Sequence, residues 1–370
     1  MPDSPIRLMV LVDSLMRGGV PTHLKMLLPA LAARGVPVCV VCLERDEVVG
    51  AELEAMGIPV RRFRIRKLRS RMALDALFSI RASIRAEGWN VIASYLFSAC
   101  FLGSILRRIT PGVRHLVAWR DTGFWLTGYY RPCMTWISRL ADGLTANSDA
   151  VECAVEQYLG RRHPRIWRVP NAVTLPPQAA LPGAGFHIGM VGRCSREKGP
   201  DVFVDAMAHL RDAGRDFTAT LAGDGPEYAA VRERVEALRL EDRVALPGMV
   251  LDTEGLYRSL RLLCVPSRSE GFSNAVLEGM SYGVPVVASA VGGNPELVSD
   301  RTGRLFETEN APALAREIMW CMDHPAECAA MGAAARERVA REYSPNVQCA
   351  AMLAALRGVL GVPDGISSTP

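Results

Sequence analysis

Two carboxylates stand close together in the stretch PSRSEGFSNAVLEGMSYGVP, residues 266–285. Glu270 follows the short apolar run at residues 262–265, which predicts a buried strand. Glu278 lies in the helical pattern that comes next, and a second apolar run at residues 284–288 predicts another strand. This order of strand, polar loop, helix and strand is typical of a doubly wound parallel sheet, in which ligands bind at the carboxyl ends of the strands.

The residues between the two glutamates add a second chemical feature. Phe272, Ser273 and Asn274 stand where the predicted helix begins, and the backbone N–H groups at a helix N-terminus attract anions. A phosphate on these amides, with hydroxyl groups donating to Glu270 and Glu278 on either side, has the shape of a diphosphate that joins two sugars. The pattern therefore predicts a nucleotide-sugar site; the alternative is that both glutamates are solvated residues of a loop and a helix.

Two cations follow another predicted strand, at residues 186–191. The loop after it, GRCSREKG, carries Arg193 and Lys198 before the next helix begins. Arginine offers a planar fork of donors to phosphate oxygens, and lysine offers a point charge. We interpret this loop as a phosphate-binding site; the alternative is an ordinary charged loop between a strand and a helix.

These motifs resemble those of family 4 of the GT-B glycosyltransferases. The main match is the E-x7-E signature, E-G-F-x-x-x-x-x-E at residues 270–278, which GVPV follows at residues 283–286. The loop G-R-x-x-x-x-K-G matches as well. Weaker matches are GGVPTH at residues 18–23, AGDGP at residues 222–226 and GGNPE at residues 292–296. The first of these reads neither G-x-G-x-x-G nor G-x-x-x-x-G-K-[ST], so a dinucleotide-binding or ATPase loop is not indicated.

The resemblance implies a GT-B fold of class α/β, with two Rossmann-like, doubly wound domains that face each other across a cleft. It implies transfer of a sugar from a nucleoside diphosphate donor, a UDP-sugar or a GDP-sugar, with retention at the anomeric carbon. Glu270 would contact the donor sugar, and Glu278 the ribose. The donor-binding residues that it implies are Gly19, Arg193, Lys198, Gly223, Gly225, Glu270, Phe272, Ser273, Asn274 and Glu278.

Stabilisation of the leaving group is the chemistry that these residues can supply. Arg193, Lys198 and the helix N-terminus would oppose the charge that grows on the departing diphosphate, so we expect these two cations and Glu270 to be catalytic. Because side-chain cations are present and the sequence has no Asp-x-Asp motif, we expect activity without a divalent metal or a cofactor. A front-face reaction, in which the departing phosphate takes the acceptor proton, needs no protein nucleophile.

The acceptor side is expected in the segment RHLVAWRDTGFW, residues 114–125, which predicts a strand and the loop after it. Related enzymes often carry a histidine near the end of this strand, whereas here His115 begins it and Arg120 and Asp121 follow it. We expect Asp121 to be catalytic by orienting the acceptor hydroxyl, with Arg120 and His115 on the same side. The alternatives are an Arg120–Asp121 pair that only shapes the loop and a His115 that is structural.

Strands and helices alternate along the whole chain, which predicts Rossmann-like domains. Strands of the first half are predicted at residues 6–12, 38–43, 60–63, 91–95, 115–119, 143–146 and 166–169. We expect an N-terminal acceptor-side domain over residues 1–178 and a C-terminal nucleotide-sugar-binding domain over residues 184–345. A last helix at residues 346–360 is expected to pack back on the N-terminal domain, and residues 361–370 to be disordered.

Charge is unevenly spread over the 370 residues, whose net charge is +4. Residues 1–171 hold 24 basic and 14 acidic side chains, and the remainder holds 19 and 25. The cations of the basic segment RRFRIRKLRSR are Arg61, Arg62, Arg64, Arg66, Lys67, Arg69 and Arg71. This segment predicts contact with an anionic membrane surface or an anionic, lipid-linked acceptor; the alternative is a solvated loop. Nucleic acid is not a predicted partner, because no recognised binding motif accompanies the charge.

The sequence does not predict a membrane span. Its most apolar run, residues 91–106, is shorter than the roughly 20 residues that a spanning helix needs, and the first residues do not resemble a signal peptide. The ten cysteines are scattered without the spacing of a zinc site. We expect a cytoplasmic protein with reduced thiols, or one that binds peripherally to the inner face of the membrane.

Together these features predict a retaining glycosyltransferase of the hexosyltransferase type. It would move a sugar from a nucleotide sugar to a glycan or lipid-linked acceptor, in the synthesis of cell-surface polysaccharide or glycolipid. One alternative is an epimerase that acts on a nucleotide sugar. The other is a non-catalytic protein that binds nucleotide sugars.

Overall fold

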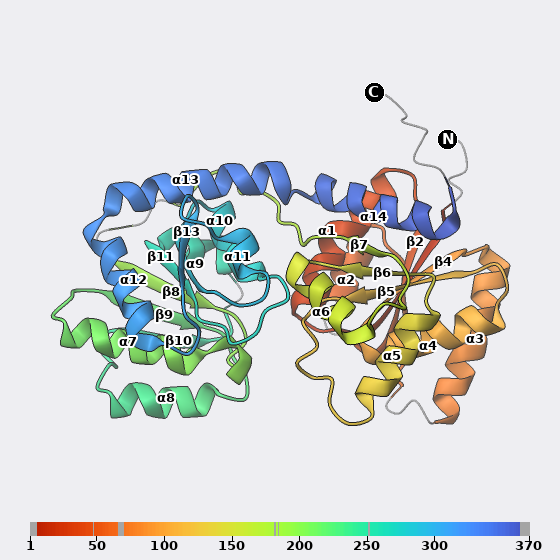
Figure 1. Ribbon diagram of the computed structural model, residues 1–370, viewed down its shortest axis with the longest axis horizontal. Helices are drawn as coiled ribbons and strands as arrows, with labels where there is room; N and C mark the ends of the chain where they lie inside the picture. Colours follow the sequence, from red (N-terminus) through yellow and green to blue (C-terminus); the bar gives the residue numbers. More distant parts are fainter. Residues whose placement is uncertain are drawn as a thin grey trace. The chain divides into compact units, whose positions relative to one another are not determined.

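The computed structural model describes residues 6–46, 48–65, 70–180, 183, 185–250 and 252–362. The chain forms two compact units (Figure 1). The first consists of the residues up to Ala172 and those from Pro345 onward, and the second consists of the residues between them. Each unit is a parallel sheet covered by helices, so the predicted α/β class with two Rossmann-like domains is confirmed.

In the described part of the first unit, seven parallel strands form one sheet in the order β3-β2-β1-β4-β5-β6-β7. The strands are β1 Leu8–Leu15, β2 Val38–Asp46, β3 Val60–Arg62, β4 Val91–Tyr95, β5 Arg114–Trp119, β6 Gly143–Ala146 and β7 Ile166–Arg168. The helices between them are α1 Gly19–Ala33, α2 Val49–Ala55, α3 Arg71–Glu87, α4 Phe97–Ile109, α5 Tyr130–Leu140 and α6 Asp149–Leu159. Successive side chains of a strand point to opposite faces: Val10 of β1 joins the core around Leu27 of α1, and Leu11 joins the core around Ile80 of α3.

The last helix, α14 (Pro345–Leu360), belongs to the first unit. It packs on α1 and on β5, β6 and β7, and its buried Met352 and Leu356 join the core of that face. Figure 1 shows it in blue beside the red α1. The amide nitrogen of Gln348 on this helix lies 2.9 Å from Nδ1 of His23 on α1, so the two helices also share a buried polar contact.

In the described part of the second unit, six parallel strands form a sheet in the order β10-β9-β8-β11-β12-β13. The strands are β8 His187–Val191, β9 Thr218–Ala222, β10 Val244–Gly248, β11 Leu262–Val265, β12 Val286–Ser289 and β13 Gly303–Phe306. The helices are η1 Arg196–Lys198, α7 Pro200–Asp212, α8 Tyr228–Ala237, α9 Thr253–Ser259, α10 Asn274–Ser281, α11 Asn294–Leu297, α12 Ala311–Asp323 and α13 Pro325–Glu342.

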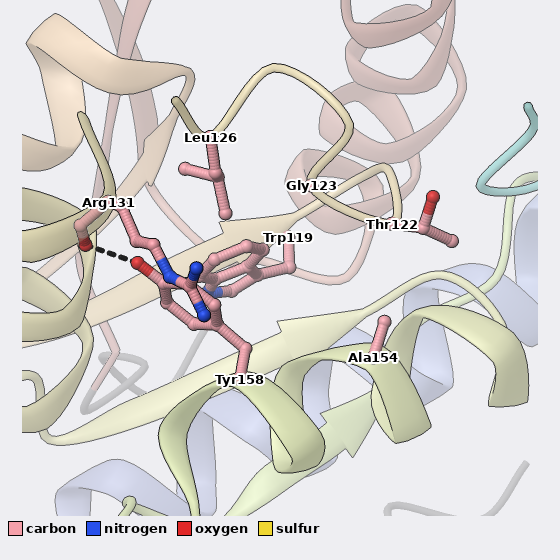
Figure 2. Close-up of a pocket in the computed structure, with 7 residues that line it drawn as sticks. All are labelled: Trp119, Thr122, Gly123, Leu126, Arg131, Ala154 and Tyr158. Carbon is pink, nitrogen blue, oxygen red and sulfur yellow. Dashed lines mark hydrogen bonds between the residues drawn. The ribbon is translucent and has the colours of Figure 1, made fainter. Parts of the chain in front are cut away.

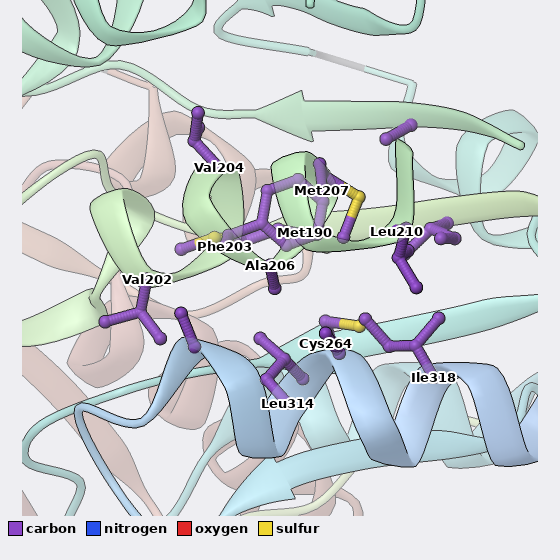
Figure 3. Close-up of a cluster of buried hydrophobic side chains, with 14 of the residues drawn as sticks. Met190, Val202, Phe203, Val204, Ala206, Met207, Leu210, Cys264, Leu314 and Ile318 are labelled. Carbon is purple, nitrogen blue, oxygen red and sulfur yellow. The ribbon is translucent and has the colours of Figure 1, made fainter. Parts of the chain in front are cut away.

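One hydrophobic core of the second unit lies between α7, α12 and the sheet (Figure 3). Phe203 and Met207 of α7, Leu314 and Ile318 of α12 and Cys264 of β11 are fully buried in it. Burying one large apolar side chain of this kind contributes about 1.5–3 kcal/mol. The core holds β8 and β11 in place, and the loops that follow these two strands carry the candidate donor-site residues.

The boundary between the units lies at Ala172, whereas the sequence pattern places it near residue 178. The segment after it is attached to the second unit, where the N–H of Val173 donates to the carbonyl of Tyr343 at 3.0 Å. Its prolines indicate a linker when the sequence is considered alone, because this backbone contact leaves no sequence signal. Of the predicted disordered tail, residues 363–370 lie outside the described residues.

Candidate functional site

The carboxyl edge of the second sheet brings together two side chains that lie 72 positions apart in the sequence. The ammonium group of Lys198 lies 2.7 Å from Oε1 of Glu270, and Ser267 donates a hydrogen bond to the same oxygen at 2.8 Å. Glu270 is only 7% exposed. Its other oxygen, Oε2, accepts no hydrogen bond from the described residues. One carboxylate oxygen is thus anchored, and the other can accept a hydrogen bond from a ligand.

Lys198 reaches this position because the chain turns sharply after η1. Gly199 has a left-handed backbone (φ +68°), and a Cβ atom there would lie 2.1 Å from the carbonyl oxygen of Pro266, directly after β11. Only glycine allows this approach. The guanidinium of Arg268 reinforces it with two hydrogen bonds to Asp201 of α7, at 2.8 and 2.7 Å. The loops after β8 and β11 are therefore locked together, which places the cation beside the carboxylate.

Arg193 is exposed in the loop after β8 and takes part in no ion pair within the described ranges. This loop packs on the glycine turn after β9. A Cβ atom on Gly223 would lie 1.7 Å from the carbonyl oxygen of Gly192, and one on Gly225 would lie 2.3 Å from that of Cys194. Close packing of the two loops therefore requires both glycines, and it fixes the backbone that carries Arg193.

The start of α10 lies in the same loop region, four residues after Glu270. The hydroxyl of Ser273 caps the helix by accepting a backbone N–H of the first turn, and the partial positive charge of a helix N-terminus lies at this end. The side chain of Phe272 is buried against Tyr343 of the same unit, with ring centroids 5.5 Å apart. The side chains of Phe272 and Ser273 thus hold the helix start in place, and their backbone is the part that can meet an anion.

Glu278 lies in the second turn of α10 and is half-buried. Burial raises the pKa of its carboxyl group, and the hydrogen bond from the Tyr257 hydroxyl to Oε2, at 2.8 Å, opposes that shift. Tyr257 is buried and stacks on Tyr282 with centroids 5.5 Å apart, which fixes the direction of its hydroxyl. The sequence singles out neither Tyr257 nor Ser267, because no motif marks them; only the fold shows that they orient the two glutamates.

In the first unit, Gly19 is the first residue of α1, which begins just after the carboxyl end of β1. His23, one turn later, is 1% exposed, and its Nε2 lies 3.1 Å from the hydroxyl of Tyr95. Burial lowers the pKa of His23, and the positive charge of Arg120 acts in the same direction. The imidazole is therefore neutral near pH 7.

Arg120 and Asp121 follow β5 at the same edge, but within the part of the chain that is described they form no ion pair with each other. The guanidinium of Arg120 donates to Oδ1 of Asn171, and burial lowers the pKa of Arg120 to about 10. The carboxylate of Asp121 accepts the N–H of Gly123 at 2.7 Å and the indole N–H of Trp125 at 2.9 Å, and burial raises its pKa. Because Asp121 folds its own loop, we assign it a positioning role in place of the expected catalytic one.

His115 lies at the amino end of β5, at the edge opposite to the carboxyl ends of the strands. It is fully buried, its Nε2 lies 2.6 Å from the hydroxyl of Ser94, and burial lowers its pKa to about 3. A Cβ atom on Gly103 would lie 2.4 Å from this imidazole, so α4 packs directly over it. The acceptor-side role expected for His115 is therefore wrong, because its position and burial keep it from a substrate.

The basic segment is partly neutralised within the first unit. Arg61 pairs with Glu87 at 2.7 Å, and Arg62 pairs with Asp46 at 2.5 Å and with Glu54 at 2.7 Å. Of the other members, Arg64 and Arg71 are exposed, and Arg66, Lys67 and Arg69 lie outside the described residues. At least two of the seven cations are therefore committed to protein carboxylates.

Within the described ranges, no three His, Cys, Asp or Glu side chains lie together as possible metal ligands. No helix in those ranges is long and apolar enough to cross a membrane. The ten cysteines are free thiols.

Two family models match the chain and meet at the boundary between its units. The glycosyl transferase 4-like domain matches residues 18–172, and glycosyl transferases group 1 matches residues 174–338. The 2-deoxystreptamine glucosyltransferase of Streptomyces kanamyceticus is 33% identical over 243 residues, which cover 61% of this chain and 63% of that protein. The lipopolysaccharide core biosynthesis mannosyltransferase LpcC of Rhizobium leguminosarum bv. viciae is 32% identical over 240 residues, which cover 61% of this chain and 67% of that protein. The matches thus span about two thirds or less of these relatives' own length.

Solved structures resemble the chain over nearly its whole length. Anabaena Alr3699/HepE, crystallised with UDP, has a TM-score of 0.81 at 22% identity, and the match covers 95% of this chain and 99% of that one. A glycosyltransferase from Rickettsia africae has a TM-score of 0.80 at 19% identity and covers 96% and 99%. These likenesses show the fold. Together with the family models and the relatives, they show that the chain belongs to the glycosyl transferases group 1 family and has the GT-B fold.

Proposed function

We propose that this chain is a retaining hexosyltransferase that moves a sugar from a UDP-sugar or a GDP-sugar to a glycan or lipid-linked acceptor, in the synthesis of cell-surface polysaccharide or glycolipid. The observation that carries the proposal is the anchored Glu270 beside Lys198 at the carboxyl edge of the second sheet, where open α/β sheets bind ligands. The relatives support it, since their names are those of a glucosyltransferase and of a mannosyltransferase of lipopolysaccharide core synthesis. HepE has been crystallised with UDP-glucose.

The diphosphate would be held by Arg193, Lys198 and the N-terminus of α10. Lysine has three N–H donors, so Lys198 can bond a phosphate oxygen while it keeps its bond to Glu270. These positive groups oppose the negative charge that develops on the departing diphosphate, and stabilisation of this kind is usually the largest single contribution to catalysis. We propose that they make a divalent metal and a cofactor unnecessary.

The two glutamates would hold the hydroxyl groups on either side of the diphosphate. Oε2 of Glu270 would accept a hydrogen bond from the donor sugar, and Glu278, oriented by Tyr257, would accept one from the ribose. Because Oε1 of Glu270 already accepts hydrogen bonds from Lys198 and Ser267, its carboxylate is a weakened nucleophile. We therefore propose a front-face reaction, in which the departing phosphate takes the acceptor proton and the anomeric configuration is retained.

We further propose that the protein works at the inner face of a membrane, on which α3 docks. Met72, Leu74 and Phe78 of this helix are 52, 56 and 60% exposed, and the exposed Arg71 and Arg85 stand at its two ends. Apolar side chains beside cations suit an anionic lipid surface, where each cation contributes about 1 kcal/mol. We therefore propose α3 as the docking surface, because the two arginines that begin the basic segment are paired with carboxylates of the protein.

A panel of UDP-sugars and GDP-sugars tests the proposal. Thermal shift identifies the donor, because a ligand at 100 times its Kd adds about 2.7 kcal/mol to the free energy of unfolding. The nucleotide products then identify the activity. A glycosyltransferase releases the nucleoside diphosphate, an epimerase converts the donor to a diastereomer without release, and a binding protein does neither. Release from one donor supports the proposal, and binding without release, in the presence of glycan and lipid-linked acceptors, contradicts it.

A further inference from the structure

A pocket of about 230 Å³ opens at the carboxyl edge of the first sheet (Figure 2). It lies among the end of β5, the loop after β5, the start of α5 and the helix α6. Its lining residues are Trp119, Thr122, Gly123, Leu126, Arg131, Ala154 and Tyr158. Three of the lining residues belong to the segment 114–125 that the sequence predicts for the acceptor side, whereas no motif marks Arg131, Ala154 or Tyr158. The pocket lies at the edge where sheets of this kind bind ligands.

Two aromatic rings form one wall of the pocket. The rings of Trp119 and Tyr158 lie with their centroids 5.6 Å apart. The hydroxyl of Tyr158 donates to the backbone carbonyl of Arg131 and accepts a hydrogen bond from Thr135 at 2.9 Å. These bonds fasten α6 to the start of α5, so the wall is preformed, as ligand pockets usually are.

The loop on the other side of the pocket is also held in place. Asp121 accepts hydrogen bonds from the N–H of Gly123 and the indole of Trp125, and the N–H of Leu126 donates to the carbonyl of Gly123 at 3.0 Å. Gly123 has a left-handed backbone, with φ +82°, which favours glycine. The carboxylate of Asp121 thus shapes the rim of this pocket, which explains why a buried acid stands after β5.

Arg131 is the charged member of the pocket lining. It forms no ion pair within the part of the chain that the structure describes, and its guanidinium carbon lies 5.8 Å from the centroid of the Tyr158 ring. Figure 2 shows its guanidinium beside the ring of Tyr158, on the side of Trp119. A guanidinium can bind a phosphate or a carboxylate through two parallel hydrogen bonds. The pocket therefore offers an uncompensated cation next to flat apolar surface.

The size of the pocket limits what can enter. Its volume of about 230 Å³ is below the roughly 300 Å³ at which ordinary small-molecule pockets begin. A nucleotide sugar is too large for it, whereas one sugar ring or the charged group of a sugar can fit. The pocket can therefore hold a single charged sugar unit but not a whole nucleotide sugar.

We propose that this pocket is a specificity subsite for the acceptor, and that it binds a sugar ring that carries an anionic group. Arg131 supplies the counter-charge, and the ring of Tyr158, which is backed by the buried ring of Trp119, supplies the surface against which the sugar ring packs. The inference rests on the proposed function, because it assigns the pocket to the second substrate of that reaction.

The test measures binding of small anionic sugars to the full chain saturated with UDP or GDP, whichever binds, so that the proposed phosphate site of the second unit is occupied. The probes are glucose 6-phosphate, glucuronate and glucose. Their binding is measured by thermal shift and by calorimetry. We expect one or both anionic sugars to bind and glucose to bind at least about tenfold more weakly, since a hydrogen bond to a charged group is lost. Binding by only one of the two anions identifies the charged group as phosphate or carboxylate.

Three variants locate the binding. Arg131→Gln should weaken it at least about tenfold, and Ala154→Leu should block it by filling the pocket while leaving the charge. Arg108→Gln is the matched control, because Arg108 is an exposed arginine in the last turn of α4, which ends before the amino end of β5, whereas the pocket lies beyond the carboxyl end of that strand. Nucleotide affinity and donor hydrolysis should be unchanged in all three variants.

The inference is overturned if neither anionic sugar binds the nucleotide-saturated wild type, or if Arg131→Gln and Arg108→Gln bind the probes alike. Failure of both UDP and GDP to bind the wild type would instead count against the proposed function. The comparison of the two arginine variants would still decide whether the pocket binds anionic sugars.

Discussion

Replacing Lys198 by methionine tests whether this lysine acts on the diphosphate or only pairs with Glu270. Its ammonium group lies 2.7 Å from the carboxylate, and the side chains of Lys198 and Glu270 are 30% and 7% exposed. Breaking a fully buried pair costs about 3–5 kcal/mol, whereas an exposed pair contributes about 0–1 kcal/mol. Because Lys198 is partly exposed and Ser267 still bonds the carboxylate, we expect Lys198→Met to lower the free energy of unfolding by about 1–2 kcal/mol.

The loss of turnover should be larger than this loss of stability. Removing one group that stabilises developing negative charge costs a factor of about 10²–10³ in kcat, or roughly 2.7–4 kcal/mol. The assay follows release of the nucleoside diphosphate to give kcat and KM separately, and urea unfolding of the same samples gives the stability. Glu270→Gln and the double variant complete a cycle that measures the pair itself.

In that cycle, we expect the double variant to regain about 1 kcal/mol of stability relative to Lys198→Met, because the unpaired buried charge is gone, but not to regain turnover. The phosphate role of Lys198 is refuted if kcat of Lys198→Met stays within about threefold of the wild type, well short of the loss expected for such a group. It is refuted equally if turnover returns in the double variant.

Tyr257→Phe should weaken nucleotide binding about tenfold, because Glu278 loses the hydrogen bond that orients it. Burial raises the pKa of Glu278 and the hydrogen bond from Tyr257 opposes that shift, so the pKa of Glu278 should rise further in the variant. Nucleotide affinity that depends on the ionised carboxylate should therefore be lost at a higher pH than in the wild type. Calorimetric titrations across acidic and neutral pH check this, and an unchanged midpoint of the affinity-against-pH curve contradicts it. Asp121→Asn should lower the melting temperature, because it weakens hydrogen bonds to a carboxylate, which contribute about 1.5–3 kcal/mol each. Because these bonds hold the loop itself, kcat should stay within about tenfold; a thousandfold fall in kcat at unchanged donor affinity would restore the catalytic role. EDTA should leave transfer unchanged, and a complete loss that magnesium reverses would show that a metal takes part. Sedimentation of the protein with anionic vesicles should fall with salt, as exposed charges are screened within about 10 Å at 0.1 M. It should be lost in Phe78→Asp but not in the control Met249→Asp, which changes an exposed methionine of the second unit. Equal binding by both variants argues against docking through α3.

Much of the two sheets could be predicted from the sequence. β4, β6 and β11 have the bounds that their short apolar runs predict, because a strand covered on both faces needs apolar side chains throughout. β13 was not predicted. Its sequence, GRLF, carries Arg304 in a half-buried middle. Among the strands that the structure describes, it pairs with β12 alone, at the edge of the sheet, so hydrophobicity alone does not reveal it.

The donor-site residues carry motifs, but their contacts do not. Lys198 and Glu270 meet only because Gly199 lets the loop after β8 approach the end of β11, and a close approach between segments 72 residues apart leaves no local pattern. Tyr257 has no motif because its role depends on where α9 places it. Only the fold shows these relations.

The acceptor side was harder to predict for the same reason. A histidine on an apolar strand can be a core residue or can contact a ligand. The burial of His115 under α4 shows that it is a core residue. Asp121 has the residue type of a catalytic acid, but its hydrogen bonds belong to its own loop. The sequence does not mark Arg131 as a binding residue, because arginine is common in the first turn of a helix. Only the fold shows that Arg131 lines a pocket.

The central claim is that the Lys198–Glu270 site holds a nucleotide sugar while its sugar is transferred. The most direct measurement gives the purified chain its matched donor and acceptor and follows both products by proton NMR, which also reports the anomeric configuration. We predict that nucleoside diphosphate and new glycoside appear in equal amounts and that the glycoside keeps the configuration of the donor. A diastereomeric nucleotide sugar formed without nucleotide release, or nucleotide binding with neither product, would contradict the account.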